Sequence, residues 1–512
     1  MAVISRTATE LSAMLGPWHD GRGPLFTALA DGIAELIDAN MIPAGTALPS
    51  QRELARQLGI SRGTVTSAYE LLEQRGRLLT RTGSGSRVRA ELSAPGANLT
   101  GRLFSFSDES RRRIDLSTGA LPASMVTREV MGQIRFDTLH DYLATNGYFP
   151  AGLPALRTAI AERLSQDGMA TTPDQIVVTS GAQHATSLVV STYLTAGDEV
   201  IVEDPSYRGA LETLRTRGAR MRSVPFERHG INLPLLEQAL AKKPVLAYLQ
   251  TGVHNPTGLT TNPARRHRLA SMLAGGPALA VEDCCSYDLT LDGRPGQTLV
   301  GLLPDDRLIS IGSLSKLFWG GIRVGWIRTS RSRVRTLLEA RKAVDLSTSV
   351  IDQLIAIRLL ERADEARRER AAMLSVARSI AEGLLHEHLP RWTWPPVDGG
   401  AALWIDTGED AAALAERAKQ AGLLISAGPN FSAHGSHRTH LRLPVARDRT
   451  TLDRALATIA GLTADRHRRG PSTRTRSGEP PRSGAPPVRP IIFARMPAPT
   501  PPEACRIASA PS

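Results

Sequence analysis

The chain has 512 residues, 41% of them hydrophobic, so it is long and apolar enough to build at least two cores. Its start lacks a signal-peptide pattern, no run approaches the roughly 18 apolar residues of a membrane helix, and only three cysteines are present, which together predict a reducing, cytoplasmic setting. The net charge of +12 is uneven, because residues 52–89 hold eight arginines against three acids and residues 463–512 hold nine against three. A local basic patch favours a nucleic-acid surface, and a solvated charged face is the alternative.

The first 23 residues are expected to be an extension, and helices follow them. Apolar residues recur at helical spacing over 25–37, which predicts a core-facing helix. Ser50 with Glu53 three positions later has the form of a capping box that opens a second helix, and Gly59 ends it. Ser61 is placed to cap a third helix.

A small hairpin is predicted after these helices. Gly76 is placed to stop the third helix, and residues 78–81 and 86–89 flank the turn-forming stretch Thr-Gly-Ser-Gly at 82–85. Three helices and a hairpin make one small domain over 24–90.

A larger domain is predicted over 114–462, after a polar, Pro/Gly-marked linker at 91–113. Short apolar runs alternate there with helical stretches, which indicates a parallel sheet covered by helices; the clearest runs are 176–178, 199–202, 246–249, 278–281 and 308–311. Residues 463–512 contain eleven prolines and few large apolar groups, so a disordered tail is expected.

The third helix has the features of a DNA-reading helix, because its first turns carry a guanidinium and three hydroxyls. The string LPSQRELARQLGISRGTVTSAYELLEQRGRLLTRTGSG closely resembles the winged helix-turn-helix domain of the GntR family of regulators. The resemblance implies that double-stranded DNA is contacted by Arg52, Ser61, Arg62, Thr64, Thr66 and, at the wing tip, Gly83. A helix cap at Ser61, a turn at Gly83 and surface ion pairs at the arginines are the structural alternatives.

A second set of residues fits pyridoxal 5'-phosphate (PLP). This cofactor needs a lysine for a Schiff base, an acid against the pyridine nitrogen, donors for the phosphate and an aromatic side chain over the ring. The sequence offers candidates for these in one order: Ser180, Gly181, Ala182 and Gln183 between a predicted strand and helix, then Tyr207, Asn255, Asp283, Ser313, Ser315, Lys316 and Arg323.

In these strings, above all HNPTG and GSLSKLFWGGIRVGW, the chain resembles class I aminotransferases of fold type I, an α/β fold. The resemblance implies a Schiff base at Lys316, an ion pair of Asp283 with the pyridinium, a hydrogen bond from Asn255 to the phenolic oxygen and stacking by Tyr207. The two serines, Arg323 and the loop 180–183 would hold the phosphate. For each of these residues taken alone, an ordinary structural role is the alternative to a cofactor role; at Asn255, for example, it is the shaping of a turn.

Two further positions follow from this resemblance, and one departs from it. Arg442 in THLRLPVA matches the arginine that binds a substrate carboxylate, and Tyr148 resembles the tyrosine that reaches the partner subunit's phosphate. Many relatives carry a tyrosine two or three residues after the aspartate, where this chain has Cys285 and Ser286, with Tyr287 only at the fourth. The departure argues against efficient transamination and leaves PLP binding possible.

The order of the two modules resembles the MocR subfamily of GntR regulators. The resemblance implies a homodimer with exchanged winged helices, in which PLP, or its adduct with an amino compound, is the sensed effector and no metal is needed. A PLP-responsive transcription regulator is therefore the leading hypothesis. An active aminotransferase that regulates its own gene and a repressor with an empty, vestigial fold are the alternatives.

Overall fold

The computed structural model describes residues 5–16, 18–19, 23–38, 41–42, 45–74, 77–81, 85–88, 113–133 and 139–468. Gly76, Gly83, the linker up to residue 112 and the tail from residue 469 lie outside the described residues. Among the described helices, none is both long and apolar enough to cross a membrane.

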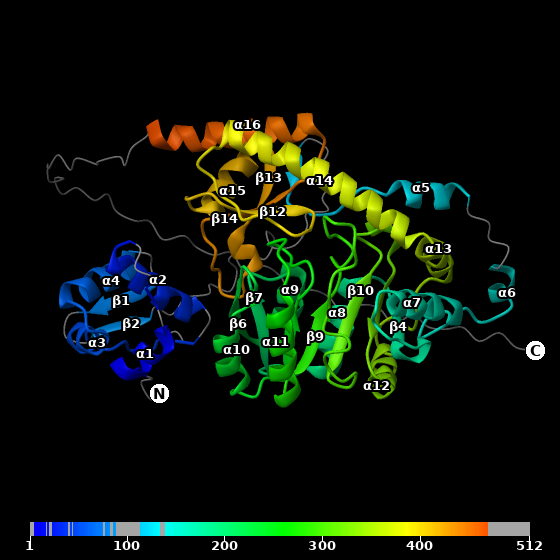
Figure 1. Cartoon of the computed structure of the whole chain (residues 1–512), viewed down its shortest axis with the longest axis horizontal. Helices are drawn as coiled ribbons and strands as arrows, with labels where there is room; N and C mark the ends of the chain where they lie inside the picture. The colour runs from blue at the N-terminus through cyan, green and yellow to red at the C-terminus, as the bar shows by residue number, and fades with distance from the viewer. Residues whose placement is uncertain are drawn as a thin grey trace, which may run out of the picture. The chain divides into compact units, whose positions relative to one another are not determined.

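The N-terminal domain contains four helices and a two-stranded sheet: α1 (Ala8–Leu15), α2 (Leu25–Asp38), α3 (Gln51–Leu58), α4 (Arg62–Gln74), β1 (Leu78–Arg81) and β2 (Gly85–Val88) (Figure 1). The predicted capping box is present, because Ser50 and Glu53 hydrogen-bond to each other's backbone N–H. Gly59 ends α3 in the left-handed conformation, with a φ of 66° that suits glycine. At the start of α4, the Ser61 hydroxyl accepts from the Thr64 amide at 3.1 Å.

Helix α1 is an element that the sequence reasoning missed. Thr7 and Glu10 form a second capping box at its start. Leu11 is fully buried in the same apolar cluster as residues of α2, α3 and α4. The segment before residue 24 therefore contributes to the core of this domain, and the spacing Thr-x-x-Glu was the signal for it.

An eight-stranded sheet forms the centre of the large domain, in the order β4-β11-β10-β9-β8-β5-β6-β7. Its strands are β4 (Ile176–Thr179), β5 (Glu199–Asp204), β6 (Arg220–Glu227), β7 (Gly230–Ile231), β8 (Leu246–Leu249), β9 (Leu279–Asp283), β10 (Leu308–Ser313) and β11 (Gly325–Arg328). The predicted parallel sheet is confirmed for six strands, but β11 runs antiparallel to both its neighbours and β7 is antiparallel to β6. After β10 the chain turns back within a short stretch, so β11 lies antiparallel beside it. The hydrophobic pattern of one strand does not indicate the direction in which that strand runs.

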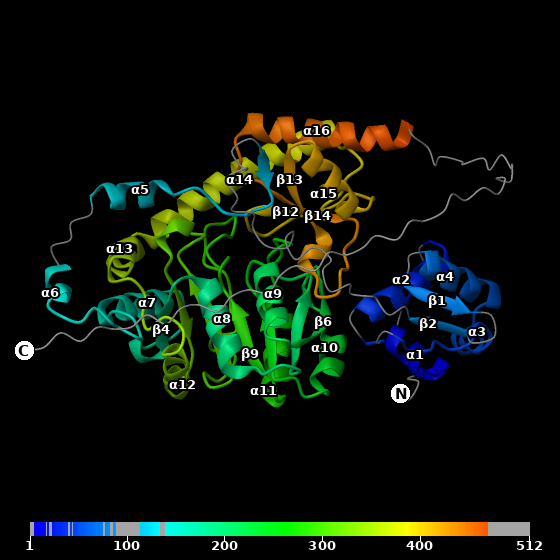
Figure 2. The ribbon, with the colours of Figure 1, turned by 180° about the vertical axis from the view of Figure 1, so that it is seen from behind.

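Helices cover both faces of this sheet, as Figure 1 and Figure 2 show from opposite sides. One face packs against α8 (Ala182–Tyr193), α9 (Arg208–Thr216) and α12 (Arg331–Arg341). The other face packs against α7 (Pro154–Gln166), α10 (Leu233–Leu240), α11 (Pro263–Gly275) and α13 (Val350–Leu360). Burial on both faces explains why the strands read as continuous apolar runs rather than as alternating patterns.

A second sheet has four strands in the order β12-β14-β13-β3: β12 (Ala402–Asp406), β14 (His440–Pro444), β13 (Leu423–Ala427) and β3 (Ile114–Leu116). Its core includes side chains of α14 (Ala363–His388), α15 (Ala411–Gln420) and α16 (Arg449–Arg468). Strand β3 pairs in parallel with β13, so residues just after the linker join the C-terminal part of the chain. Helix α16 continues six residues past the predicted domain end at 462. The remaining elements are α5 (Met125–Gly132), α6 (Leu139–Leu143) and the short 3-10 turns η3 (Pro173–Gln175), η4 (Gly320–Ile322) and η5 (Gly428–Phe431).

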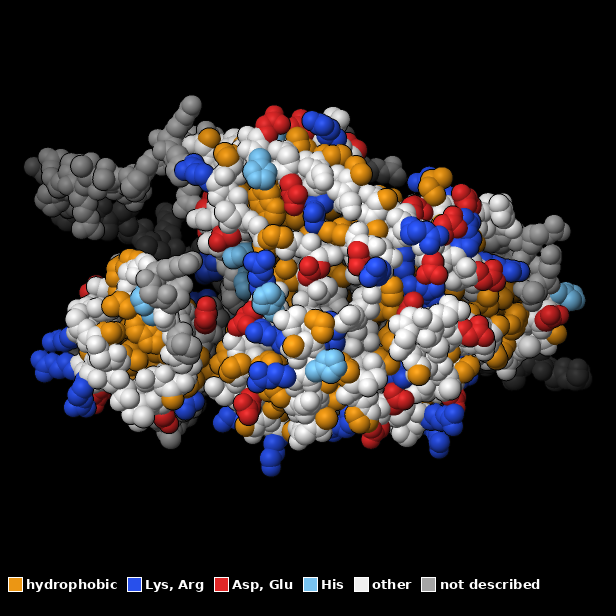
Figure 3. All heavy atoms as spheres, in the orientation of Figure 1, with side chains coloured by type: hydrophobic (Ala, Val, Ile, Leu, Met, Phe, Trp, Pro, Cys, Tyr) orange, Lys and Arg blue, Asp and Glu red, His pale blue; other side chains and the backbone are white. Residues whose placement is uncertain are grey.

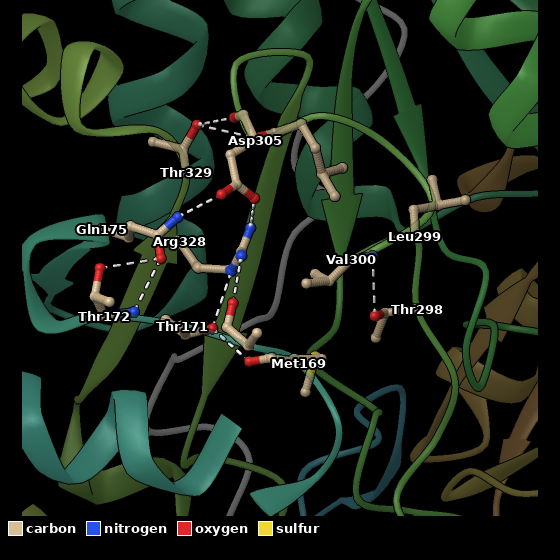
Figure 4. A network of polar contacts seen from close by, with 12 residues as sticks. Met169, Thr171, Thr172, Gln175, Thr298, Leu299, Val300, Asp305, Arg328 and Thr329 are labelled. Carbon is tan, nitrogen blue, oxygen red and sulfur yellow. Dashed lines mark hydrogen bonds and ion pairs between the residues drawn. The ribbon is translucent and has the colours of Figure 1, made fainter. Parts of the chain in front are cut away.

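A polar network anchors β11 where it leaves the sheet (Figure 4). The guanidinium of Arg328, which is 3% exposed, pairs with Asp305 at 2.5 Å and donates to Thr171 at 3.1 Å. Gln175 donates to the second Asp305 oxygen at 2.6 Å, and the Thr329 hydroxyl donates to the Asp305 carbonyl. One carboxylate thus holds the ends of three chain segments together.

Asp305→Ala is expected to lower the free energy of unfolding by about 2 kcal/mol, because it leaves a buried guanidinium without its charge partner. The effect stays below the roughly 3–5 kcal/mol of a fully buried pair because the Asp305 side chain is 40% exposed. Urea denaturation measures it, with Asp306→Ala as the control at the exposed neighbouring position. Equal destabilisation by both substitutions would contradict the assigned role.

Candidate functional site

The predicted cofactor residues gather where parallel strands end. Asp283 is the last residue of β9 and Ser313 the last of β10, while Tyr207 follows β5 and Asn255 follows β8. Because β5, β8, β9 and β10 run in parallel, their carboxyl ends meet at one edge of the sheet, which is the usual place for a ligand in such folds.

Lys316 lies in the turn after β10, and its ammonium is buried. The Nζ atom donates to the carbonyl of Gly119 at 2.7 Å. Burial, and after it the nearby Arg442, lower the pKa of Lys316 to about 8. A lysine in this state loses its proton far more easily than an exposed one, as a nucleophilic amine must.

Asp283 is held in place by groups that bond to both of its carboxylate oxygens. The hydroxyl of Tyr248 on β8 donates to Oδ2 at 2.5 Å, and the backbone amide of Cys285 donates to Oδ1 at 2.8 Å. Tyr248 is 3% exposed, and burial raises its pKa well above the ordinary value. The sequence reasoning missed Tyr248, because an aromatic residue in a buried strand also fits an ordinary core position.

Arg442 on β14 faces the same site from the second sheet. Its guanidinium donates to the side-chain oxygen of Asn255 at 3.3 Å and to the carbonyl of Ser117 at 2.9 Å. Burial and then the neighbouring Arg208 lower the pKa of Arg442 to about 9. The Asn255–Pro256 peptide bond is cis, and the Asn255 backbone exchanges hydrogen bonds with the Gln250 side chain.

Four of the predicted phosphate residues form two contacts. The hydroxyls of Ser313 and Ser315 are 3.0 Å apart. Arg323, in the left-handed conformation with a φ of 52°, donates to the carbonyl of Ser180 at 2.7 Å. This contact brings the guanidinium from the turn before β11 to the turn before α8, where helical N–H groups favour an anion.

The turn before α8 depends on glycine. Gly181 has a φ of 90° and is the N-cap of the helix, so Ala182 and Gln183 are its first residues. A Cβ on Gly325 of β11 would lie 2.8–2.9 Å from the backbone of this turn, so the two chains pass closely. The Gln183 side chain points away to α9, where it donates to the Gly209 carbonyl and the Thr213 hydroxyl.

A pocket of about 340 Å³, part of which is open solvent, lies beside Lys316, Asn255 and Arg442. Lys316, Asn255 and Arg442 line it, together with backbone or side chains of Gly119, His254, Pro256, Gly258, Ser286, Leu289, Gly400, Ala401 and Ala402. The structure therefore brings the amine of Lys316, the amide of Asn255 and the guanidinium of Arg442 to one cavity.

Tyr207, Tyr148 and Tyr287 differ in their burial and in the residues around them. Tyr207 is the N-cap of α9, and burial, followed by the charges of Cys285 and Asp283, raises its pKa to about 12. Tyr148 is 59% exposed and does not line the pocket, so its role stays a prediction that needs a second subunit. Tyr287 packs under the guanidinium of Arg367 and also does not line the pocket, so it does not replace the missing tyrosine.

Two histidines, His254 and His184, lie near these residues and have partners of their own. His254 stacks on Phe226 with ring centroids 3.8 Å apart, and burial lowers its pKa to about 3. His184 accepts from the Ser180 amide. Both arrangements agree with packing and positioning roles.

This donor set fits PLP. The cofactor requires a reactive amine, and the buried Lys316 provides one with a lowered pKa. It requires an oriented carboxylate, and both oxygens of Asp283 are fixed by donors. Hydroxyls, a guanidinium and a helix N-terminus are available for an anionic group at the other end of the site.

The lowered pKa of Lys316 predicts how PLP uptake depends on pH. Only the neutral amine attacks an aldehyde, so the rate of covalent uptake is expected to rise with pH and to level off above a midpoint of about 8, instead of the 10.5 of an ordinary lysine. Stopped-flow absorbance after mixing protein and PLP measures this rate. A rate that still climbs through pH 10 would contradict the proposed environment of Lys316.

The DNA-reading candidates lie at the N-terminal ends of α3 and α4. Arg52, Ser61 and Arg62 are exposed, and the Ser61 hydroxyl also contacts that of Thr64 at 2.9 Å. The Thr66 hydroxyl bonds to the Gln51 side chain at 3.0 Å and so connects the two helices. Figure 3 shows arginine side chains, in blue, projecting from the side of this domain that carries α3, which contains no lysine. Gly83 lies outside the described residues.

Two protein-family models match the chain. Residues 112–459 match aminotransferase class I and II, and residues 26–88 match bacterial regulatory proteins of the gntR family. The two matches cover the predicted large and small domains.

The individual proteins that are similar to this chain include both regulators and an aminotransferase. An uncharacterized HTH-type transcriptional regulator of Escherichia coli, YjiR, is 27% identical over 445 residues, which are 82% of this chain and 94% of the relative. A probable rhizopine catabolism regulatory protein of Rhizobium meliloti, MocR, is 28% identical over 333 residues, 60% of this chain and 66% of the relative. The crystal structure of the α-aminoadipate aminotransferase LysN of Thermus thermophilus, complexed with N-(5'-phosphopyridoxyl)-L-leucine, has a TM-score of 0.62 and 26% identity, covering 70% of this chain and 96% of that one.

The helix-turn-helix match precedes the aminotransferase match in this chain, and the similarity to YjiR spans 94% of that regulator. The chain therefore belongs to the aminotransferase class I and II family and, with its GntR-family DNA-binding domain, is a regulator of the MocR type whose cofactor is PLP.

Proposed function

We propose that this protein regulates transcription in response to PLP, or to an amino compound bound through PLP, without substantial turnover. The observation that carries the proposal is the coexistence, on one chain, of an exposed Arg62 on a DNA-reading helix and a buried Lys316 in a pocket that fits PLP. The effector regulates only if it binds two conformations of the protein unequally.

The roles at the pocket follow from the chemistry of each side chain. When bound, PLP supplies an aldehyde that combines reversibly with primary amines. Lys316 holds the cofactor covalently, Asp283 keeps the ring nitrogen protonated, and Asn255 donates to the phenolic oxygen. Tyr207 stacks on the ring, and Arg442 binds the carboxylate of an effector. The phosphate is bound by Ser180, Gly181, Ala182, Gln183, Ser313, Ser315 and Arg323.

On the DNA side, the exposed residues at the starts of α3 and α4 enter or border the major groove. Arg62 and Thr64 reach base edges, while Arg52, Ser61 and Thr66 fix the register on phosphates, and Gly83 approaches the minor groove. We propose a DNA-binding domain over 24–90 with helix α1 packed into its core, a linker at 91–113 and the PLP domain at 114–462, with a tail beyond. The site of action is the cytoplasm, where the DNA is.

A homodimer with exchanged winged helices completes the proposal. Two readers on one dimer engage two half-sites and raise the affinity through effective concentration. Tyr148, which is exposed in the single chain, reaches the phosphate of the partner's cofactor. Light scattering of the full chain tests the stoichiometry, and a monomer at micromolar concentration would contradict this part.

Steady-state amino-group transfer distinguishes a regulator from a working aminotransferase. Purified PLP-loaded protein is mixed with several amino acids and 2-oxoglutarate, and the amount of keto product per site is measured. We expect about one turnover per site or fewer, since neither Cys285 nor Ser286 supplies the phenol of the missing tyrosine. Many turnovers per site would favour the enzyme instead.

A further inference from the structure

A second cavity lies beside the large sheet, on the face that α7 covers. Its volume is about 380 Å³, part of which is open solvent, and it shares no lining residue with the pocket at Lys316. Its walls come from α7, from β10 and β11, and from the segment that follows β9. Cys284, next to Asp283, and Ser313 also line it, so a ligand there contacts the strand ends that carry proposed cofactor residues. Figure 4 shows part of its wall, with Met169, Thr298, Val300 and Arg328 labelled.

Asp288 contributes to this wall a carboxylate that uses only one of its oxygens. Its Oδ1 atom accepts from Nε of Arg367 at 2.5 Å, while no described residue hydrogen-bonds to Oδ2. The side chain of Asp288 lines the cavity and is 16% exposed. One carboxylate oxygen can therefore accept from a ligand that enters the cavity.

The carboxylates around Asp288 outnumber the cations that pair with them. Two guanidinium groups, of Arg163 and Arg367, serve three carboxylates at N–O distances of 2.5–3.4 Å: Asp167, Asp288 and Asp364. Burial, and after it the charge of Asp167, raise the pKa of Asp288 to about 7. A further cation beside Asp288 offsets this repulsion and favours the ionised carboxylate.

A buried hydroxyl in the same wall also lacks a partner. Ser310 on β10 is 6% exposed, and its Oγ atom has no hydrogen-bond partner among the described residues. A ligand that donates to Oγ removes the cost of this unsatisfied group. Arg328, which lines the cavity as well, has its guanidinium paired with Asp305, so its charge is already compensated.

Much of the remaining wall is apolar and includes Leu164, Met169, Val300 and Trp326. Ordered water finds few partners on these side chains, whereas a short alkyl chain packs against them. The indole of Trp326 favours a cation over an anion. Among the described residues, no group of three or more His, Cys, Asp or Glu side chains is suited to a metal ion, and Asp288 is the one acid in this wall. An organic cation therefore fits the second cavity better than a metal ion does.

We propose that the second cavity binds small primary ammonium ions without a covalent bond. The ammonium group donates to Oδ2 of Asp288 and to Oγ of Ser310, and a short alkyl chain packs against the apolar part of the wall. The site needs neither PLP nor Lys316, so the inference goes beyond the proposed function and does not depend on it.

The test compares 1-aminopropane, which is protonated at neutral pH, with 1-propanol, which has a similar shape and no charge. Each is titrated into the PLP-free full chain at about pH 8, above the pKa of Asp288, and saturation-transfer NMR gives the two Kd values. Without PLP no aldehyde is present to react with the amine, and the cations Lys316 and Arg442 disfavour an ammonium ion in the cofactor pocket. We expect 1-aminopropane to bind at least about tenfold more tightly than 1-propanol.

Asp288→Asn is expected to reduce this preference, the ratio of the two Kd values, by about tenfold or more, because it removes the charge and keeps the shape. Asp364→Asn is the matched control. It removes a charge from the same cluster, but Asp364 is 65% exposed and does not line the cavity, so the ratio should stay within about twofold.

Two further variants keep the proposal testable even if Asp288→Asn does not fold. Ser310→Ala breaks no hydrogen bond among the described residues and should raise the Kd of 1-aminopropane by about threefold or more. Val300→Phe fills the cavity, leaves every charge in place and should abolish the binding of both probes. A wild type that binds both probes equally or binds neither would overturn the proposal, as would equal losses in Asp288→Asn and Asp364→Asn. Failure of the wild type to form a PLP chromophore would defeat the proposed function and leave this inference standing.

Discussion

Lys316→Ala is expected to remove the visible chromophore of the PLP-treated protein completely. Lys316 is the buried amine that lines the pocket, so without it no covalent bond to the cofactor forms there. Borohydride reduction followed by mass spectrometry should find about one labelled lysine per chain in the wild type and none in the variant. The visible absorbance band should disappear in parallel.

The matched control for this substitution is Lys342→Ala. Lys342 is exposed and pairs only with its helical neighbour Glu339 among the described residues, so its loss should leave the band and the label unchanged. A chromophore that persists in Lys316→Ala, or that disappears equally in Lys342→Ala, would show that the cofactor is attached elsewhere or only to surface lysines.

Arg62→Ala is expected to weaken binding to operator DNA by about 1–3 kcal/mol, a factor of roughly 5–150, and to leave the PLP spectrum unchanged. The reason is geometric, because the exposed Arg62 is the first residue of α4 and a recognition helix reads bases with its N-terminal turn. Fluorescence anisotropy with DNA from the region upstream of the gene, at one fixed salt concentration, measures the change.

Arg335→Ala provides the control for charge alone. Arg335 is exposed on α12 of the PLP domain, so its removal changes the net charge by the same amount far from the reader in sequence. Arg62→Ala and Arg335→Ala should therefore differ clearly in operator affinity. If they weaken binding equally, Arg62 acts through general electrostatics and not through the groove contact that we assign to it.

The local features of the fold were predictable from the sequence. The capping box at Ser50, the left-handed glycine at Gly59 and the cap at Ser61 are confirmed, because each depends on residues within one helical turn. The apolar runs that became β4, β5, β8, β9 and β10 were also identified, because strands buried on both faces leave a clear signal.

Features that depend on distant residues were not predictable in this way. The pairing of β3 with β13 joins positions about 300 residues apart, and no local pattern encodes it. Tyr248 belongs to the site only because the fold brings it to Asp283. Helix α1 is the exception, since its capping box was visible in the sequence and was overlooked.

The structure shows what the three residues after Cys284 do, where many relatives carry the tyrosine that this chain lacks. Cys285 uses its backbone amide to orient Asp283, Ser286 lines the pocket, and Tyr287 packs against Arg367. The chain therefore keeps the residues that we propose to hold PLP, while none of these three residues places a phenol in the pocket. This combination suits a protein that binds the cofactor and its amino partners more than one that turns them over.

The most direct test of the account is the effect of PLP on operator binding. The Kd of the full-length wild type for its operator should change by at least about fivefold between PLP-free and PLP-saturated protein, which corresponds to a coupling of about 1 kcal/mol. Lys316→Ala should bind the operator with a Kd that does not respond to PLP. A wild-type Kd that is the same with and without PLP would show that the cofactor pocket and the DNA reader are not coupled.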